Sequence, residues 1–158
     1  MSEPERRVPR RFVVDTNVFV AAIKSFSKQG RESSAVTGSL TLLLRLINDT
    51  EFELFADLLL LDEYRRLEAE LNSKTGTIIL NELTTRMHEV TKLTEKAVER
   101  CRPYLPEEEA ADVLHAATAL QSKAVLISND RDFERIGDSG LIEVWSTSEA
   151  IRRLLAKA

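Results

Sequence analysis

The sequence predicts an α/β fold, a three-layer α/β/α sandwich in which helices cover both faces of a central parallel sheet. Short apolar runs of strand length alternate along the chain with segments whose apolar residues recur at helical spacing. The apolar run at residues 124–128 suits a parallel strand that is buried on both faces. Strands that alternate with helices imply right-handed crossovers and a central parallel sheet with helices on both faces.

The first half of the chain alternates strand and helix signals. A β-prone run at 12–14 ends at Asp15, and a helix over 18–23 follows, capped by residues 15–17. The polar stretch 25–34 predicts a loop. The next expected elements are a helix over 35–48, a strand over 52–55, a helix from Asp57 that carries Glu63, a break at 73–77 and a helix over 78–88.

The second half continues this alternation. Pro106 and the acids after it predict the start of a helix that runs through Gln121, because acids in a first turn favour the helix dipole. The other expected elements are a strand over 89–93, a helix capped by Thr94, the strand at 124–128, a helical turn over 131–137, a strand over 141–145 and a capped C-terminal helix.

The composition is that of one compact domain. The chain has 158 residues, of which 43% are hydrophobic and 30% are charged, enough for a single core. The net charge of −4 disfavours a general nucleic-acid coat protein, which needs excess Lys and Arg. We expect a flexible arm over residues 1–10 and one domain over 11–158.

Cysteine content and hydropathy indicate a cytoplasmic protein without membrane contact. Cys101 is the only cysteine, which excludes an intramolecular disulfide and a cysteine-based zinc site. No apolar run approaches the roughly 20 residues that cross a bilayer, and the polar, basic N-terminus lacks an apolar signal core.

Acidic residues follow two of the predicted strands. In open α/β sheets, ligands bind beyond the carboxyl ends of the strands, where Asp15 and Asp130 are expected. If these strands are neighbours, the two carboxylates share one rim, and the helices that carry Glu63 and Asp112 can lean over it. A cluster of acids without nearby Lys or Arg is tolerated mainly when a cation neutralises it.

Oxygen ligands of this kind favour Mg²⁺ or Mn²⁺. A metal so held orients water, lowers the pKa of that water and shields the charge that builds on a phosphodiester during in-line attack. The residues therefore indicate phosphodiester hydrolysis.

Four segments carry a resemblance to a known family. VVDTNVFVAA, LLLLDEYRRLE, AADVLHAATAL and LISNDRDF, in this order, resemble the acidic motifs of PIN-domain nucleases over almost the whole ordered chain. The resemblance implies that the four family acids are Asp15, Glu63, Asp112 and Asp130, with Ser128 as the small polar residue before the last, Asn17 in the DTN start, and Asp132 as an acid that binds metal through water.

The motifs are most similar to bacterial and archaeal PIN proteins of the VapC type, the toxin components of toxin-antitoxin systems. This resemblance implies an RNA substrate, a homodimer and an inhibitory antitoxin partner. We expect a divalent-metal-dependent endoribonuclease, in which Asp15, Asp112 and Asp130 bind the metal directly and Glu63 binds it or positions the attacking water.

Structural alternatives exist for three of the four acids. Asp15 and Asp130 are also suited to a helix cap and a turn, and Asp62 competes with Glu63 on a charged helix.

Three further residues near Asp112 have alternative roles. Glu108 and Glu109 share its helix face and either decorate the helix start, the interpretation we favour, or add a metal ligand. His115, one turn later, either contacts substrate or, as the commoner outcome, is a packed, hydrogen-bonded histidine.

Two rival functions remain in view. A haloacid-dehalogenase-like phosphatase also begins at a strand-end aspartate, but it needs a second aspartate where this chain has Asn17. A PIN-derived scaffold that binds a partner without catalysis is the alternative that is not an enzyme.

Overall fold

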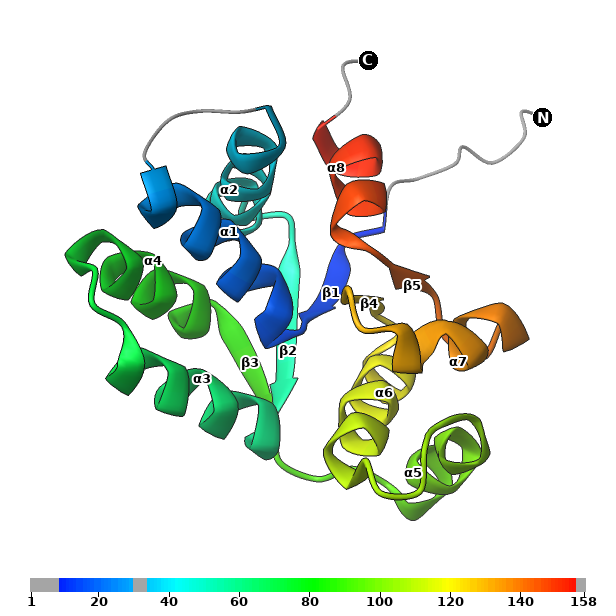
Figure 1. Cartoon of the computed structure of the whole chain (residues 1–158). Helices are drawn as coiled ribbons and strands as arrows, with labels where there is room; N and C mark the ends of the chain where they lie inside the picture. Colours follow the sequence, from blue (N-terminus) through cyan, green and yellow to red (C-terminus); the bar gives the residue numbers. More distant parts are fainter. Residues whose placement is uncertain (1–8, 30–33, 156–158) are drawn as a thin grey trace.

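The computed structural model describes residues 9–29 and 34–155 and contains a five-stranded parallel sheet (Figure 1). The strands are β1 (Arg11–Val14), β2 (Glu53–Asp57), β3 (Met87–Val90), β4 (Val125–Ile127) and β5 (Val144–Trp145). Their order is β3-β2-β1-β4-β5, and every neighbouring pair is parallel. The predicted central parallel sheet is confirmed.

Helices form a layer on each side of this sheet (Figure 1). One layer contains α1 (Thr16–Gln29), α2 (Ser34–Asn48), α3 (Leu58–Glu70), α4 (Lys74–Thr85) and α8 (Thr147–Leu155), which contact one another. The other contains α5 (Glu95–Cys101), α6 (Ala110–Ser122) and α7 (Glu134–Ser139), together with the short 3-10 helices η1 (Arg102–Tyr104) and η2 (Arg131–Phe133). Because α6 packs against β1, β2 and β4, it is the central helix of its layer.

The core lies on the two central strands. All residues of β4 and three of the four in β1 are buried. The ring of Phe12 packs against Phe52 and Trp145, at centroid distances of 5.4 and 5.8 Å. In the described part of the chain, no helix is long and apolar enough to span a bilayer.

Some boundaries in the first half differ from the prediction. The loop expected over 25–34 is wrong for its first residues, because α1 continues to Gln29; residues 30–33 lie outside the described part. The break expected at 73–77 is also wrong, because Ser73 caps α4 by accepting a hydrogen bond from the backbone of Gly76 at 3.0 Å. The helix therefore begins and ends earlier than predicted, and β3 follows at Met87.

In the second half, the helix predicted from Pro106 begins later. Residues 106–109 form a turn in which the N–H of Glu109 donates to the carbonyl of Pro106 at 3.0 Å, and α6 starts at Ala110. As a result, Asp112 lies in the first turn of α6. The predicted cap at Thr94 is confirmed, since its hydroxyl accepts from the N–H of Ala97 at 3.1 Å.

The strand order reverses between β1 and β4. The chain leaves β1 toward β2 on one side of the sheet, and β4 toward β5 on the other. Val14 pairs with Ile127, and the N–H of Asp15 donates to the Ile127 carbonyl at 3.0 Å. The strands that end at Asp15 and Asp130 are therefore neighbours, at the switch point where α/β proteins bind ligands.

The N-terminal arm predicted over residues 1–10 lies mostly outside the described residues, although the carbonyl of Arg10 accepts a hydrogen bond from the N–H of Glu53.

Candidate functional site

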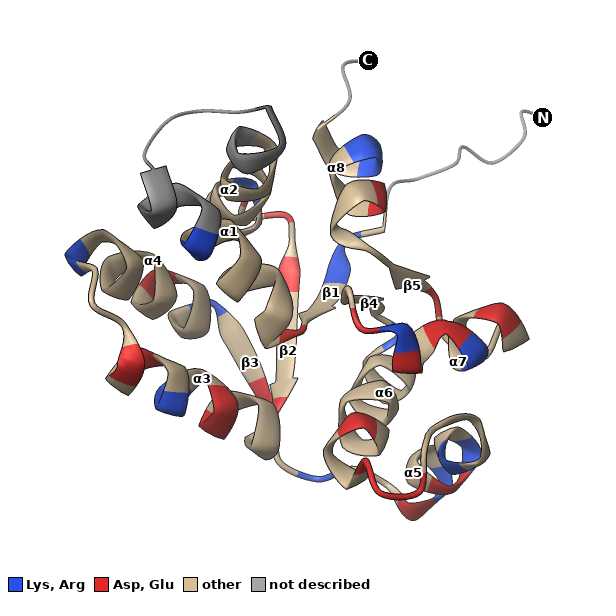
Figure 2. Cartoon of the chain, viewed as in Figure 1, with Lys and Arg blue, Asp and Glu red and all other residues tan. Residues whose placement is uncertain are grey.

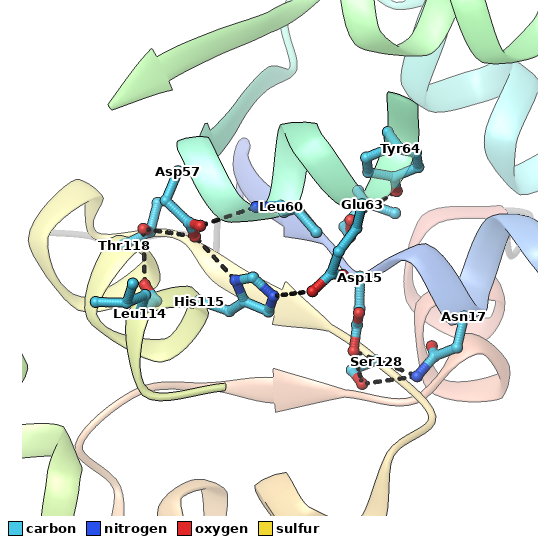
Figure 3. A network of polar contacts seen from close by, with 11 residues as sticks. Asp15, Asn17, Asp57, Leu60, Glu63, Tyr64, Leu114, His115, Thr118 and Ser128 are labelled. Atoms are coloured by element: carbon cyan, nitrogen blue, oxygen red, sulfur yellow. Dashed lines mark hydrogen bonds and ion pairs between the residues drawn. The ribbon is translucent and has the colours of Figure 1, made fainter. Parts of the chain in front are cut away.

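Asp15 is held by two side chains at the switch point (Figure 3). The Ser128 hydroxyl donates to Asp15 Oδ2 at 2.7 Å, and the Asn17 amide donates to the same oxygen at 3.2 Å. The N–H of Asn129 donates to Asn17 Oδ1 at 3.1 Å. Asp15, Asn17 and Ser128, which the sequence singled out, thus tie the loop after β1 to the loop after β4.

Burial controls the acidity of Asp15, whose relative exposure is 7%. Desolvation raises the pKa of its carboxyl group above the ordinary value, and the hydrogen bond from Ser128 opposes this rise. The negative charge of Glu63 also raises the pKa, whereas His115 lowers it. Asp15 therefore shares an electrostatic environment with groups from α3 and α6.

Asp130 uses one carboxylate oxygen in the local turn. Its Oδ1 accepts from the N–H of Asp132 at 2.9 Å, which caps η2, and its own N–H donates to Ser128 Oγ at 3.0 Å. The alternative of a turn-forming Asp130 is confirmed by this contact. The residue nevertheless lies directly after β4, at the rim predicted for it.

A buried histidine joins two carboxylates beside Asp15 (Figure 3). His115 Nδ1 lies 2.9 Å from Asp57 Oδ2, and its Nε2 lies 3.3 Å from Glu63 Oε2. Both ring nitrogens face carboxylate oxygens, which can only accept hydrogen bonds, so both contacts are hydrogen bonds when both nitrogens carry a proton and donate it. Burial lowers the pKa of His115, but the hydrogen bonds to Asp57 and Glu63 outweigh burial and raise it to about 10. The two contacts and the raised pKa both favour the imidazolium form of His115.

This cation changes one expectation from the sequence, which assigned neutralisation of the acids to a metal alone. His115 supplies a positive charge inside the cluster itself. The interpretation of His115 as a packed, hydrogen-bonded histidine agrees with its 1% exposure and its two partners.

Asp57 is the site residue that sequence reasoning missed. It is 2% exposed, and its carboxylate accepts from the N–H of Leu60 at 2.9 Å and from the Thr118 hydroxyl at 3.1 Å, besides His115. Burial raises the pKa of Asp57, but the hydrogen bond and charge of His115 more than offset this and lower it. The signal that could have found it is its place at the end of a strand, like Asp15 and Asp130.

The helix α3 also settles which acid faces the site. Glu63 points toward His115 and Asp15, with 29% of its side chain exposed (Figure 3). Asp62 pairs instead with Arg65 on the outer surface at 2.7 Å, and 50% of its side chain is exposed. The position predicted for Glu63 is therefore the inward one.

Asp112 has an unsatisfied carboxylate. Its Oδ2 is buried and finds no hydrogen-bond donor among the described residues. Desolvation and then repulsion from Asp130 raise the pKa of Asp112 to about 7, with further repulsion from Glu109 and Asp15. A carboxylate in these surroundings favours either a proton or a cation.

Three acids approach one another most closely. In the described ranges, a set of three possible ligand atoms within 4.8 Å of one another occurs only at Glu109, Asp112 and Asp132. Asp15, Glu63 and Asp130 lie outside this tight set. Glu109 occupies the N-cap position of α6, at the helix start as expected, although its side chain forms no capping hydrogen bond.

The acids come from four parts of the chain that the fold brings to one edge. Figure 2 shows acidic residues at the end of β1, on α3, on the first turn of α6 and on the segment after β4. Oxygen donors of this type, with one orphaned oxygen among them, match the preference of Mg²⁺ and Mn²⁺. The residues present therefore fit a hard divalent cation.

A parallel α/β/α sandwich with carboxylates at its switch point defines a class of α/β proteins with acidic, metal-compatible sites. Within that class the family is determined by sequence: the PIN domain matches residues 12–139. The chain belongs to the PIN-domain family. This membership excludes the alternative of a haloacid-dehalogenase-like phosphatase.

Solved structures with the same fold are distant in sequence. VapBC2 from Rickettsia felis, bound to a DNA fragment from its promoter, has a TM-score of 0.56 and 18% identity, with 86% of this chain and 98% of that chain covered. FitAcB from Neisseria gonorrhoeae has a TM-score of 0.55 and 19% identity, with 87% and 98% covered. FitAB bound to an IR36 DNA fragment has a TM-score of 0.52 and 20% identity, with 86% and 94% covered. No curated protein matches the sequence.

Proposed function

We propose that this protein is a divalent-metal-dependent endoribonuclease that hydrolyses RNA phosphodiester bonds with Mg²⁺ or Mn²⁺. The observation that carries the proposal is the buried, unpartnered Oδ2 of Asp112 among further acids. An unsatisfied buried carboxylate oxygen is unfavourable, and a divalent cation would satisfy it. Membership of the PIN-domain family supports the same class of reaction.

The metal would be held by acids from separate elements. The direct ligands would be Asp15, Asp112 and Asp130. Glu63 would bind the metal or position the attacking water, and Asp132 would act through a water molecule. Glu109 is an added candidate ligand because it lies close to Asp112 and Asp132. When bound, the metal lowers the pKa of a water molecule and offsets charge on the phosphate. Asn17 and Ser128 orient Asp15, since both donate to the same oxygen.

Arg131 is an exposed cation beside two of the site acids, and we propose that it contacts an RNA phosphate. It lies between Asp130 and Asp132 in the sequence, and 87% of its side chain is exposed, with only a long contact of 3.8 Å to Glu134. Exposed arginines beside an active site contact phosphates and offset repulsion between nucleic acid and acidic groups. With a net charge of −4, the protein depends on such local contacts rather than on a basic surface.

The partners proposed are those that the VapC-like resemblance implies: a second copy of the chain and an antitoxin protein. Support comes from the fold shared with the VapBC2 and FitAB structures. The cytoplasm is the compartment we propose, because Cys101 is a buried thiol with no disulfide partner. Residues 11–158 would act as one nuclease domain, since the site draws on elements from β1 to η2.

Cleavage of single-stranded RNA in Mn²⁺ tests the proposed activity. We expect cleavage that chelation abolishes and that Asp15→Asn reduces by at least about 100-fold, because a direct ligand is lost; this corresponds to about 2.7 kcal/mol. Asp62→Asn is the matched control, since Asp62 faces away from the site, and it should retain activity.

Equal cleavage by wild type and Asp15→Asn would contradict the assignment. A wild-type protein that neither cleaves RNA nor takes up Mn²⁺ in calorimetry would overturn the enzyme proposal in favour of a scaffold.

A further inference from the structure

We propose that His115, anchored by Asp57, is a positioning residue that holds the Glu63 carboxylate in place at the acidic site. The inference rests on the function proposed above for Glu63. It adds two residues, Asp57 and His115, that the acidic motifs do not include.

The contacts form a chain of polar groups across two helices (Figure 3). Asp57 Oδ2 accepts from His115 Nδ1 at 2.9 Å, and His115 Nε2 reaches Glu63 Oε2 at 3.3 Å. Asp57 ends β2, Glu63 lies on α3 and His115 lies on α6. One imidazole therefore connects an anchor on the sheet to an acid on a helix.

The Asp57 end of this series of polar contacts is fixed. Its carboxylate is nearly fully buried and has donors from the Leu60 backbone and the Thr118 hydroxyl as well as from His115. Because these bonds leave the carboxylate little freedom, they set the plane and position of the imidazole. Groups that orient the ligands of a metal site act in this way, through a hydrogen bond to the ligand.

The Glu63 end, by contrast, has freedom that His115 removes. Glu63 is a long, flexible side chain with 29% exposure, and among the described residues its side chain hydrogen-bonds only to His115. Without that contact it could rotate into solvent. His115 also lies one helical turn after Asp112 on α6, so the same contact sets the position of the α3 acid relative to the α6 acid.

A merely structural histidine would serve Asp57 alone, and two substitutions separate the roles. In His115→Asn, the side-chain amide lies near the place of Nδ1 and can donate to Asp57 but cannot reach Glu63. In His115→Gln, the longer side chain carries its amide to the place of Nε2, where it can donate to Glu63. His88→Gln is the matched control, because His88 is exposed on β3.

The test measures Mn²⁺ affinity by calorimetry, RNA cleavage rates and unfolding midpoints for these variants. We expect His115→Asn to weaken Mn²⁺ binding by roughly tenfold and to lower kcat at least as much, as loss of an orienting partner does. His115→Gln should recover most of both. His115→Asn should nevertheless be the more stable of the two, because it keeps the bond to the buried Asp57.

A second comparison asks whether His115 acts through Glu63. In a Glu63→Gln background, adding His115→Asn should change neither Mn²⁺ affinity nor kcat further, because the coupled group is already altered. A further loss equal to that in the wild-type background would overturn the inference, as would a His115→Gln variant that is no better than His115→Asn.

The two proposals fail in different ways. If the wild-type protein binds Mn²⁺ and cleaves RNA while both His115 variants match it, the positioning role is wrong and the nuclease proposal stands. If the wild-type protein neither binds Mn²⁺ nor cleaves RNA, the nuclease proposal is wrong and this inference falls with it.

Discussion

Replacement of Asp112 by asparagine is expected to abolish RNA cleavage and, at the same time, to stabilise the metal-free protein. Cleavage should fall by at least about 100-fold, or about 2.7 kcal/mol, because a direct metal ligand is lost. Stability should rise because the neutral amide removes the repulsion from Asp130 and the desolvation of a charge that raise the pKa of Asp112 to about 7. After solvent screening at this half-buried group, we expect a gain on the order of 1 kcal/mol.

The pH dependence of this gain has a defined sign. Because the folded protein holds the Asp112 proton up to about pH 7 and the unfolded chain only to the ordinary value of 3.8, the folded state binds more protons between these values. The stability of wild type relative to Asp112→Asn should therefore fall as pH rises from about 4 to about 7 and then level off.

Urea unfolding of both proteins without metal, across this pH range, measures the effect. Glu108→Gln, at an exposed acid in the turn that precedes α6, is the control and should show little change. A destabilised Asp112→Asn variant at pH 8, or one that cleaves RNA normally, would contradict the account of a strained, metal-binding carboxylate.

Removal of the Asp57 side chain should produce the largest loss of stability. Asp57→Ala leaves the His115 imidazolium buried with only the partly exposed Glu63 as its partner and takes away the cap of α3, where Asp57 accepts from Leu60. Breaking a buried charge pair on one side costs about 3–5 kcal/mol, a large part of the roughly 5–15 kcal/mol by which proteins are stable.

Urea unfolding at pH 7 checks this expectation, with Asp62→Ala as the exposed control. If Asp57→Ala does not fold, Asp57→Asn provides the measurement, since it keeps an acceptor for the Leu60 N–H and should lose less than the alanine variant but more than about 1 kcal/mol. A loss below 1 kcal/mol in either variant would show that the Asp57–His115 pair does not hold the site together.

The sequence predicted the sheet well because its central strands have simple patterns. The apolar runs that end at Asp15 and at Asn129 are buried on both faces in the structure, and parallel strands read as such runs. Helix starts were harder to predict. Pro106 with the following acids resembles a first turn, yet the chain makes a separate turn before α6 begins at Ala110.

The site was predictable where it follows strand ends and hidden where it depends on packing. Asp15 and Asp130 follow neighbouring strands, so their shared edge could be inferred from the alternation of elements. The pairing of His115 with Asp57 spans 58 residues and depends on how α6 packs against β2 and α3. No periodicity in a single sequence encodes that contact, which is why the internal cation of the acidic cluster was missed.

A crystal of the protein soaked in Mn²⁺ tests most directly whether distant carboxylates share one ion. The account predicts an anomalous peak at the carboxyl edge of β1 and β4, with Asp112 and at least one of Asp15 and Asp130 about 2.1 Å from it. Refined coordinates in which Asp112 does not coordinate Mn²⁺, because the ion binds elsewhere or not at all, would contradict the account.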